Sequence, residues 1–169
     1  MVCKQLAACI ADTYTSCKRE RECIEYTDSR STVRCEEHRK KYLLKNDMQK
    51  VRIRKYRLDH GIVKDEKGFD ACDNLLAVYD GENPKLIFVE LKGNDLKHAI
   101  EQVYLNIQHF GPELKKNRFY ARIVHTQGIP RIGNSGKQVD LEGAVRSRGG
   151  NLKMKEWTLS ESLSELDNK

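Results

Sequence analysis

The segment that most constrains the fold of this chain is residues 73–92. Within it, residues 85–92 read Lys-Leu-Ile-Phe-Val-Glu-Leu-Lys, and such a near-continuous apolar run is typical of a central strand covered on both faces. Residues 72–79 predict a second strand. The turn between the two strands contains the pairs Asp-Gly and Asn-Pro, which both favour chain reversal. The segment therefore predicts a β-hairpin inside a sheet.

Three charged side chains lie at the open end of this predicted hairpin. Glu90 and Lys92 are two residues apart on one strand, so their side chains point to the same face. Counting outward from the turn 81–83, eight residues lead back to Asp73 and seven lead on to Glu90, so these two carboxylates lie roughly opposite each other. Charged groups at the end of a buried strand are costly. The patch therefore predicts either a functional site or a paired structural bridge.

Two neighbouring carboxylates suit a divalent cation, because Mg²⁺ prefers oxygen ligands and keeps several of its waters. A lysine beside them can orient or deprotonate a metal-bound water, and it can stabilise the negative charge that develops on a phosphate. This interpretation has a plain alternative. In that alternative Glu90 and Lys92 form a solvated strand end, and Asp73 is only a turn residue.

The spacing of these residues resembles the motif of the PD-(D/E)xK nuclease superfamily. The resemblance is carried by Cys-Asp-Asn-Leu-Leu, beginning at Cys72, and by Phe-Val-Glu-Leu-Lys-Gly at residues 88–93, with sixteen residues between the two acids. It covers about residues 35–159. The one departure is Cys72, which stands where the superfamily motif has proline.

What this resemblance implies is metal-dependent cleavage of phosphodiester bonds. Asp73, Glu90 and the backbone carbonyl of Leu91 would hold Mg²⁺ or Mn²⁺, and Lys92 would serve the attacking water. Gln102 resembles a glutamine that several branches of the superfamily carry on the helix after the motif. The expected activity is that of an endonuclease acting on DNA rather than RNA, in defence against foreign DNA or in repair.

Periodic patterns elsewhere predict an α/β fold in which a mixed central β-sheet is flanked by helices. Helices are expected at residues 35–46, 96–110 and 138–148, and further strands at 51–58, 119–125 and 152–159. The order helix-strand-strand-strand-helix-strand matches the restriction-endonuclease-like core that the resemblance implies.

Composition divides the chain into three parts. Residues 1–33 are rich in Cys, Thr and Ser and predict a small N-terminal appendage. Residues 34–159 form the expected nuclease domain, and residues 160–169 an acidic tail.

Two further carboxylates can support the site, and a third competes with it. Asp59 is either a metal ligand or part of a turn with the His and Gly that follow it. Glu37, on the predicted first helix, can lend a carboxylate to the metal, although a charged helix face is usually only solvated. Asp70 competes with Asp73 for the motif position. Asp73 is preferred because it opens the apolar strand.

The basic charge of the chain is concentrated. There are 31 Lys and Arg against 25 Asp and Glu, a net charge of +6, and ten of the basic residues lie between positions 34 and 57. The strand at 51–58 alternates apolar and basic residues, and its cations can follow a phosphodiester backbone. These cations are Arg52, Arg54, Lys55 and Arg57. The rival function is a non-catalytic module that retains the nuclease fold and only binds nucleic acid or docks a partner.

Five of the six cysteines lie in the first 35 residues. Cys17, Cys23, Cys35 and His38 can form a zinc site of the Cys₃His type, although the gap between the first two cysteines is longer than usual. The alternative is a set of small buried thiols. No apolar run is long enough for a membrane span or a signal peptide, so a cytoplasmic protein without membrane contact is expected. The small size predicts a homodimer or a subunit of a larger complex.

Overall fold

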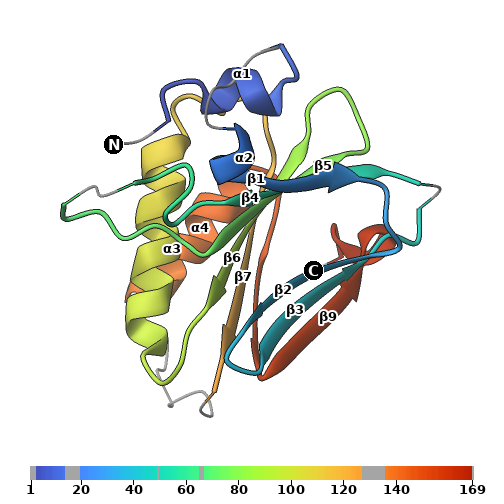
Figure 1. Ribbon diagram of the computed structural model, residues 1–169. Coiled ribbons are helices and arrows are strands. Elements are labelled where there is room, and N and C mark those ends of the chain that lie inside the picture. Colours follow the sequence, from blue (N-terminus) through green and yellow to red (C-terminus); the bar gives the residue numbers. More distant parts are fainter. Residues whose placement is uncertain (1–2, 14–19, 49, 65–66, 127–135, 169) are drawn as a thin grey trace.

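The computed structural model describes the chain except for residues 1–2, 14–19, 49, 65–66, 127–135 and 169. It is a mixed α/β fold with two sheets flanked by helices (Figure 1). The six-stranded sheet has the order β1 (Ile24–Asp28), β4 (Arg52–Arg57), β5 (Asn74–Tyr79), β6 (Lys85–Leu91), β7 (Phe119–His125) and β8 (Leu152–Glu156). The three-stranded sheet consists of β2 (Thr32–Glu37), β3 (Lys40–Lys45) and β9 (Thr158–Ser162).

The predicted hairpin is confirmed and lies at the centre of the six-stranded sheet. β1, β4, β5 and β6 are antiparallel neighbours, whereas β6, β7 and β8 run parallel. Asn74 pairs with Val89, and one step further along this register Asp73 faces Glu90. Figure 1 shows the short sheet packed against one face of this large sheet and the helices against the other.

Both faces of the hairpin are covered, which explains its nearly continuous apolar sequence. Leu86 and Phe88 pack with the helices α3 (Leu96–Phe110) and α4 (Gly136–Ser147). Ile87 and Val89 point the other way, into a second core that they share with the three-stranded sheet. Glu90 has the same parity as Phe88, so its side chain extends toward the α3 side.

The helix expected at 96–110 has those bounds in the structure, and the one expected at 138–148 begins and ends within two residues of the prediction. Asp95 is the N-cap of α3, and its carboxylate accepts a hydrogen bond of 2.9 Å from the backbone N–H of His98. This cap satisfies a donor that the first helical turn leaves open. α3 is thereby anchored directly after the Glu90–Lys92 segment.

The helix predicted at 35–46 is wrong, because these residues form the hairpin of β2 and β3. Buried residues alternate with more exposed ones through most of both strands, and Cys35 and Tyr42 face inward. His38 and Arg39 both have positive φ, at 43° and 71°, and form the two-residue turn that joins the strands. The tertiary packing of this alternating face overrides the helical spacing of the charged residues.

The single strand predicted at 152–159 is two strands in different sheets. The chain leaves β8 and enters β9 through Trp157, whose φ is 58°. The sequence also predicts an acidic tail over 160–169, whereas β9 continues to Ser162 and is followed by the short 3₁₀-helix Leu163–Glu165. Leu163 and Leu166 are buried because they complete the second core.

Residues 1–33 also differ from the expected appendage. β1 is an outer strand of the main sheet, paired with β4. Leu6 and Ile10 of the short helix α1 (Leu6–Ile10) are buried in the core that contains α3. The other N-terminal helix, α2 (Glu20–Cys23), leads directly into β1. The described part of this segment therefore belongs to the same packed unit as the central hairpin.

A buried ion pair joins the two sheets. Arg122 of β7 is fully buried and donates to the carboxylate of Glu161 on β9. Lys153 and Tyr42 donate to the same carboxylate, each at 2.8 Å. Burial alone would raise the pKa of Glu161, but these donors outweigh it and hold the pKa below the ordinary value. The ionised carboxylate is thus part of the packing between the sheets.

No helix among the described residues is both long and apolar enough to span a bilayer.

Candidate active site

A cavity of about 330 Å³ opens at the end of the β5–β6 hairpin, between the large sheet, α3 and the β2–β3 turn. It is lined by every residue that the sequence predicts for catalysis or its support. These are Asp73, Glu90, Leu91, Lys92, Asp59, Glu37 and Gln102. Residues up to 65 positions apart in the sequence, Glu37 and Gln102, therefore meet at one place.

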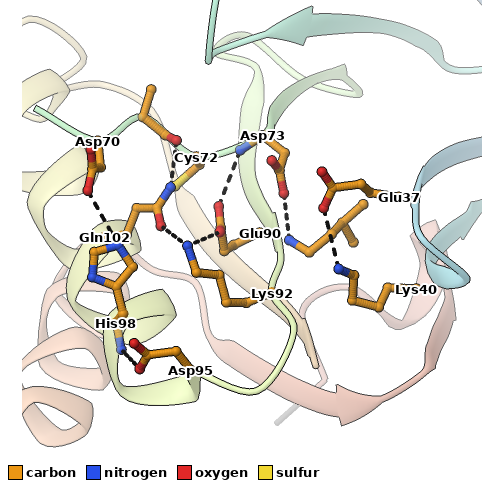
Figure 2. A network of polar contacts seen from close by, with 12 residues as sticks. Glu37, Lys40, Asp70, Cys72, Asp73, Glu90, Lys92, Asp95, His98 and Gln102 are labelled. Atoms are coloured by element: carbon orange, nitrogen blue, oxygen red, sulfur yellow. Dashed lines mark hydrogen bonds and ion pairs between the residues drawn. The ribbon is translucent and has the colours of Figure 1, made fainter. Parts of the chain in front are cut away.

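The two carboxylates of the motif are fixed by backbone hydrogen bonds across the hairpin. The backbone N–H of Asp73 donates to Glu90 Oε2 at 3.3 Å, and the backbone N–H of Leu91 donates to Asp73 Oδ2 at 2.7 Å. Figure 2 shows this reciprocal pair at the centre of the polar network. The expected convergence of Asp73 and Glu90 is thus present, and each carboxylate keeps an oxygen outside this pair of bonds.

Lys92 is held beside Glu90 by the helix that follows it. Its Nζ lies 3.9 Å from Glu90 Oε1 and donates to Gln102 Oε1 at 3.3 Å. Gln102 in turn donates through Nε2 to the backbone carbonyl of Ala71 at 2.6 Å. α3 therefore positions the ammonium through the glutamine side chain, as the dashed contacts of Figure 2 show.

The electrostatics of the cavity leave its carboxylates short of positive charge. Glu90 is only 2% exposed, and burial is the main cause that raises its pKa, followed by the nearby charge of Asp73. Burial also raises the pKa of Asp73. Lys92 opposes the shift at Glu90 but does not cancel it. A divalent cation would supply the missing charge.

The donors present fit Mg²⁺ or Mn²⁺. Two carboxylates and the Leu91 carbonyl are hard oxygen ligands, and Mg²⁺ characteristically takes only one or two carboxylates and retains water. Within the described parts of the chain, no group of three or more His, Cys, Asp or Glu side chains is arranged to hold a metal. The set at this cavity is therefore a pair of carboxylates with a carbonyl.

Two neighbours of the site do not follow from the sequence reasoning. Lys40 is almost fully buried, lies with Nζ 3.4 Å from Glu37 Oε2, and its charge lowers the pKa of Asp73 against the effect of burial. His98 lies with Nε2 3.3 Å from Asp70 Oδ2, and both residues line the cavity. Lys40 is missed because a helix is expected there. Period-two alternation in residues 40–45 is the signal that could have revealed it.

The cysteines expected to bind zinc are not brought together where the structure describes them. Cys17 lies outside the described residues. Cys23 packs in the core with α3, whereas Cys35 packs in the core on the opposite face of the sheet. His38 is exposed in the β2–β3 turn. Burial raises the pKa of Cys35 to about 12, which favours the neutral thiol over the thiolate that binds metals.

The basic strand β4 has its cations paired with nearby acids. Arg54 binds Asp12 at 2.7 Å, and Arg52 forms an ion pair with the same carboxylate. Lys55 and Arg57 lie 2.9 and 3.5 Å from Glu25.

β4 runs antiparallel to β5, so its two ends differ in their distance from the cavity. Arg57 pairs with Asn74 and lies at the end beside the site, whereas Arg52 pairs with Tyr79 at the far end.

Comparison of the chain with protein-family models, with curated proteins and with solved structures gives no match. The chemistry of the cavity is the basis for the function proposed below.

Proposed function

We propose that this chain is a metal-dependent nuclease with a restriction-endonuclease-like core, hydrolysing phosphodiester bonds in DNA. The observation that carries the proposal is the convergence of Asp73, Glu90, Lys92 and Gln102 in one cavity. A structural salt bridge does not require a second buried carboxylate opposite the first. The uncompensated burial of two acids is instead characteristic of functional sites.

Asp73, Glu90 and the Leu91 carbonyl would hold Mg²⁺ or Mn²⁺. When bound, such an ion acts as a Lewis acid toward a phosphodiester and makes a bound water more acidic. Lys92 would orient the attacking water and balance the negative charge that grows on the phosphate. Gln102 is a positioning residue, because it contacts Lys92 Nζ and is itself tied to Ala71.

The proposed reaction is a hydrolysis. The water oxygen bonds to phosphorus, one P–O ester bond breaks, and the departing oxygen receives a proton. The products are a phosphate monoester and a free hydroxyl. Glu37 and Lys40 line or adjoin the same cavity from the β2–β3 hairpin, and Lys40 would add positive charge on the side of Asp73 away from Lys92.

The test is cleavage of plasmid and single-stranded DNA by the purified chain, with Mg²⁺, with Mn²⁺ and with a chelator. The proposal predicts cleavage that needs the metal and that Glu90→Gln abolishes. Glu82→Gln is the matched control, since Glu82 is an exposed glutamate in the turn at the opposite end of the same hairpin. It should leave the rate unchanged.

The outcome that refutes the enzyme is a folded protein that binds nucleic acid but cleaves neither substrate with any metal. That result would favour the non-catalytic module. Equal loss of activity in Glu90→Gln and Glu82→Gln would also count against the site, because the loss would then not depend on whether the substituted residue lines the cavity.

A further inference from the structure

Trp157 is the only tryptophan of the chain, and the residue is 48% exposed. It forms the single-residue link between β8 and β9, at the point where the chain passes from one sheet to the other. Large aromatic side chains are usually placed where they can bury most of their area. A half-exposed tryptophan at a corner is therefore not explained by core packing.

The backbone at this corner is held by two hydrogen bonds and has an unfavourable φ angle. The N–H of Trp157 donates to the His125 carbonyl at 2.8 Å, and its own carbonyl accepts from the N–H of Lys41 at 2.8 Å. Its φ of 58° lies in the left-handed region, which Gly, Asn and Asp occupy most readily. A bulky residue such as tryptophan rarely adopts this φ angle, and residues with such rare φ angles cluster at ligand-contacting sites.

Trp157 lies at the same edge of the sheet as the proposed active site. β6, β7 and β8 are parallel, so their carboxyl ends share one edge. Leu91 pairs with Val124, and His125 pairs with Glu156. Two strand spacings of about 4.8 Å therefore separate the Lys92 backbone from the corner, or roughly 10 Å.

Exposed cations and carboxylates both lie near this edge, and Glu156 directly precedes Trp157. Arg39 is exposed in the β2–β3 turn, two residues before Lys41, whose backbone binds the Trp157 carbonyl. Lys155 is exposed at the end of β8. Acidic neighbours are present as well, and Glu36 pairs with the Lys41 ammonium at 3.4 Å. An aromatic face beside cations is the combination that holds single-stranded nucleic acids, through base stacking and backbone charge.

We propose that Trp157 stacks against an unpaired base of the substrate, so that the preferred substrate carries a single-stranded segment next to the scissile bond. The proposal rests on the proposed function for the role of the neighbouring cavity. A span of roughly 10 Å corresponds to about three stacked nucleotides at 3.4 Å each. Duplex DNA keeps its bases paired and offers no free base face except at an end.

The lone tryptophan makes its own emission a probe of this contact. We would titrate the full chain, in chelator so that no cleavage occurs, with fluorescent-labelled oligodeoxythymidine of about 12 nucleotides. Oligouridine and a DNA duplex of the same length form the other arms. Label anisotropy reports binding, and tryptophan emission reports stacking. We expect single strands, of DNA or RNA, to bind with quenching, and the duplex to bind without it.

Trp157→Ala should weaken single-strand binding by about 5- to 150-fold, the effect expected for loss of one base stack, whereas Trp157→Phe should keep most of the affinity. Leu105→Ala is the matched control, because Leu105 is also 48% exposed but lies on α3 away from the corner. It should bind as the parent does. Melting curves of each variant ensure that only folded proteins are compared.

Several results would overturn the inference. The first is binding of oligonucleotide with unchanged tryptophan emission, the second is parental affinity in Trp157→Ala, and the third is equal quenching by duplex and single strand. Absence of all oligonucleotide binding would overturn it too. If single strands bind with quenching but no metal supports cleavage, the nuclease function fails while the stacking site stands. If the parent cleaves DNA and Trp157→Ala binds and cleaves equally well, only the stacking site fails.

Discussion

Replacing Glu90 with glutamine should make the protein more stable while abolishing its proposed activity. Glu90 is 2% exposed, faces Asp73, and has its nearest cation, Lys92, 3.9 Å away. Glutamine has nearly the same shape and still accepts the hydrogen bond from the Asp73 backbone N–H. The substitution removes an uncompensated buried charge and leaves the packing in place.

The size of this gain follows from the raised pKa of Glu90. Each unit of pKa shift corresponds to about 1.4 kcal/mol, and the shift at Glu90 already includes the opposing attraction to Lys92. Because Glu90 and Asp73 also influence each other, only part of the shift is converted, and we expect a gain of about 1–3 kcal/mol near pH 8. For a chain of this size, 1 kcal/mol moves Tm by about 2–4 °C, so Tm should rise by roughly 2–12 °C.

The pH dependence has a definite sign. Because the folded-state pKa lies above the ordinary value of 4.5, protonation of Glu90 favours the folded protein at low pH, and that contribution is lost as the pH rises toward the raised pKa. The advantage of Glu90→Gln should therefore vanish near pH 4.

Glu161→Gln is the matched control with the opposite sign. This glutamate is also buried, but its carboxylate is bound by Arg122, Lys153 and Tyr42. Removing its charge leaves Arg122 buried without a counter-charge and should cost about 3–5 kcal/mol. Because the folded-state pKa of Glu161 is lowered, its stabilising contribution is present at neutral pH and is lost as the pH falls.

Thermal and urea unfolding of the parent and both variants at several pH values measure these differences. If Glu90→Gln is destabilised like Glu161→Gln, then Glu90 belongs to a structural salt bridge, and the electrostatic case for a metal site is lost.

Three other predictions concern activity and binding. Lys92→Ala should fold but cleave about 10²- to 10⁴-fold more slowly, and Lys92→Arg should not restore the rate, because arginine is larger and stays protonated; time courses on folded protein decide this. Arg57→Gln should weaken DNA binding and reduce the slope of log K against log salt concentration by about 1, whereas Arg52→Gln at the far end of β4 should change neither. Equal effects of the two substitutions in a salt titration would show that DNA does not bind preferentially at the end of β4 beside the cavity. Because burial raises the pKa of both Asp73 and Glu90, protons should compete with Mg²⁺ for these carboxylates well above pH 4. The Mg²⁺ concentration that gives half-maximal cleavage should therefore rise as the pH falls. A constant value of this concentration over pH 5–8 would contradict the prediction.

The central hairpin and α3 could be predicted because their signals are local. The apolar run at 85–91, the turn residues after Tyr79 and the Asp95 cap each lie within the element that they define. The hairpin register then fixed the relation between Asp73 and Glu90. The core of the candidate site follows from residues within one supersecondary unit.

The elements of the fold that the sequence does not predict depend on contacts between residues that are far apart in the sequence. The β2–β3 hairpin turns through His38 and Arg39 rather than through the Gly or Asn that usually adopt positive φ, so the turn has no clear signature. Trp157 breaks the last strand in the same way. Arg122 and Glu161 pair across 39 positions, which explains why an acidic segment at the end of the chain is built into the core.

Anomalous diffraction from Mn²⁺-soaked crystals can show whether the cavity at the end of the hairpin binds a divalent cation. We expect an anomalous peak within about 2.0–2.3 Å of a carboxylate oxygen from both Asp73 and Glu90 and of the Leu91 carbonyl oxygen. This peak should be absent from Glu90→Gln crystals. A cavity that stays free of Mn²⁺ at saturating concentration, or an ion that binds equally well in Glu90→Gln, would contradict it.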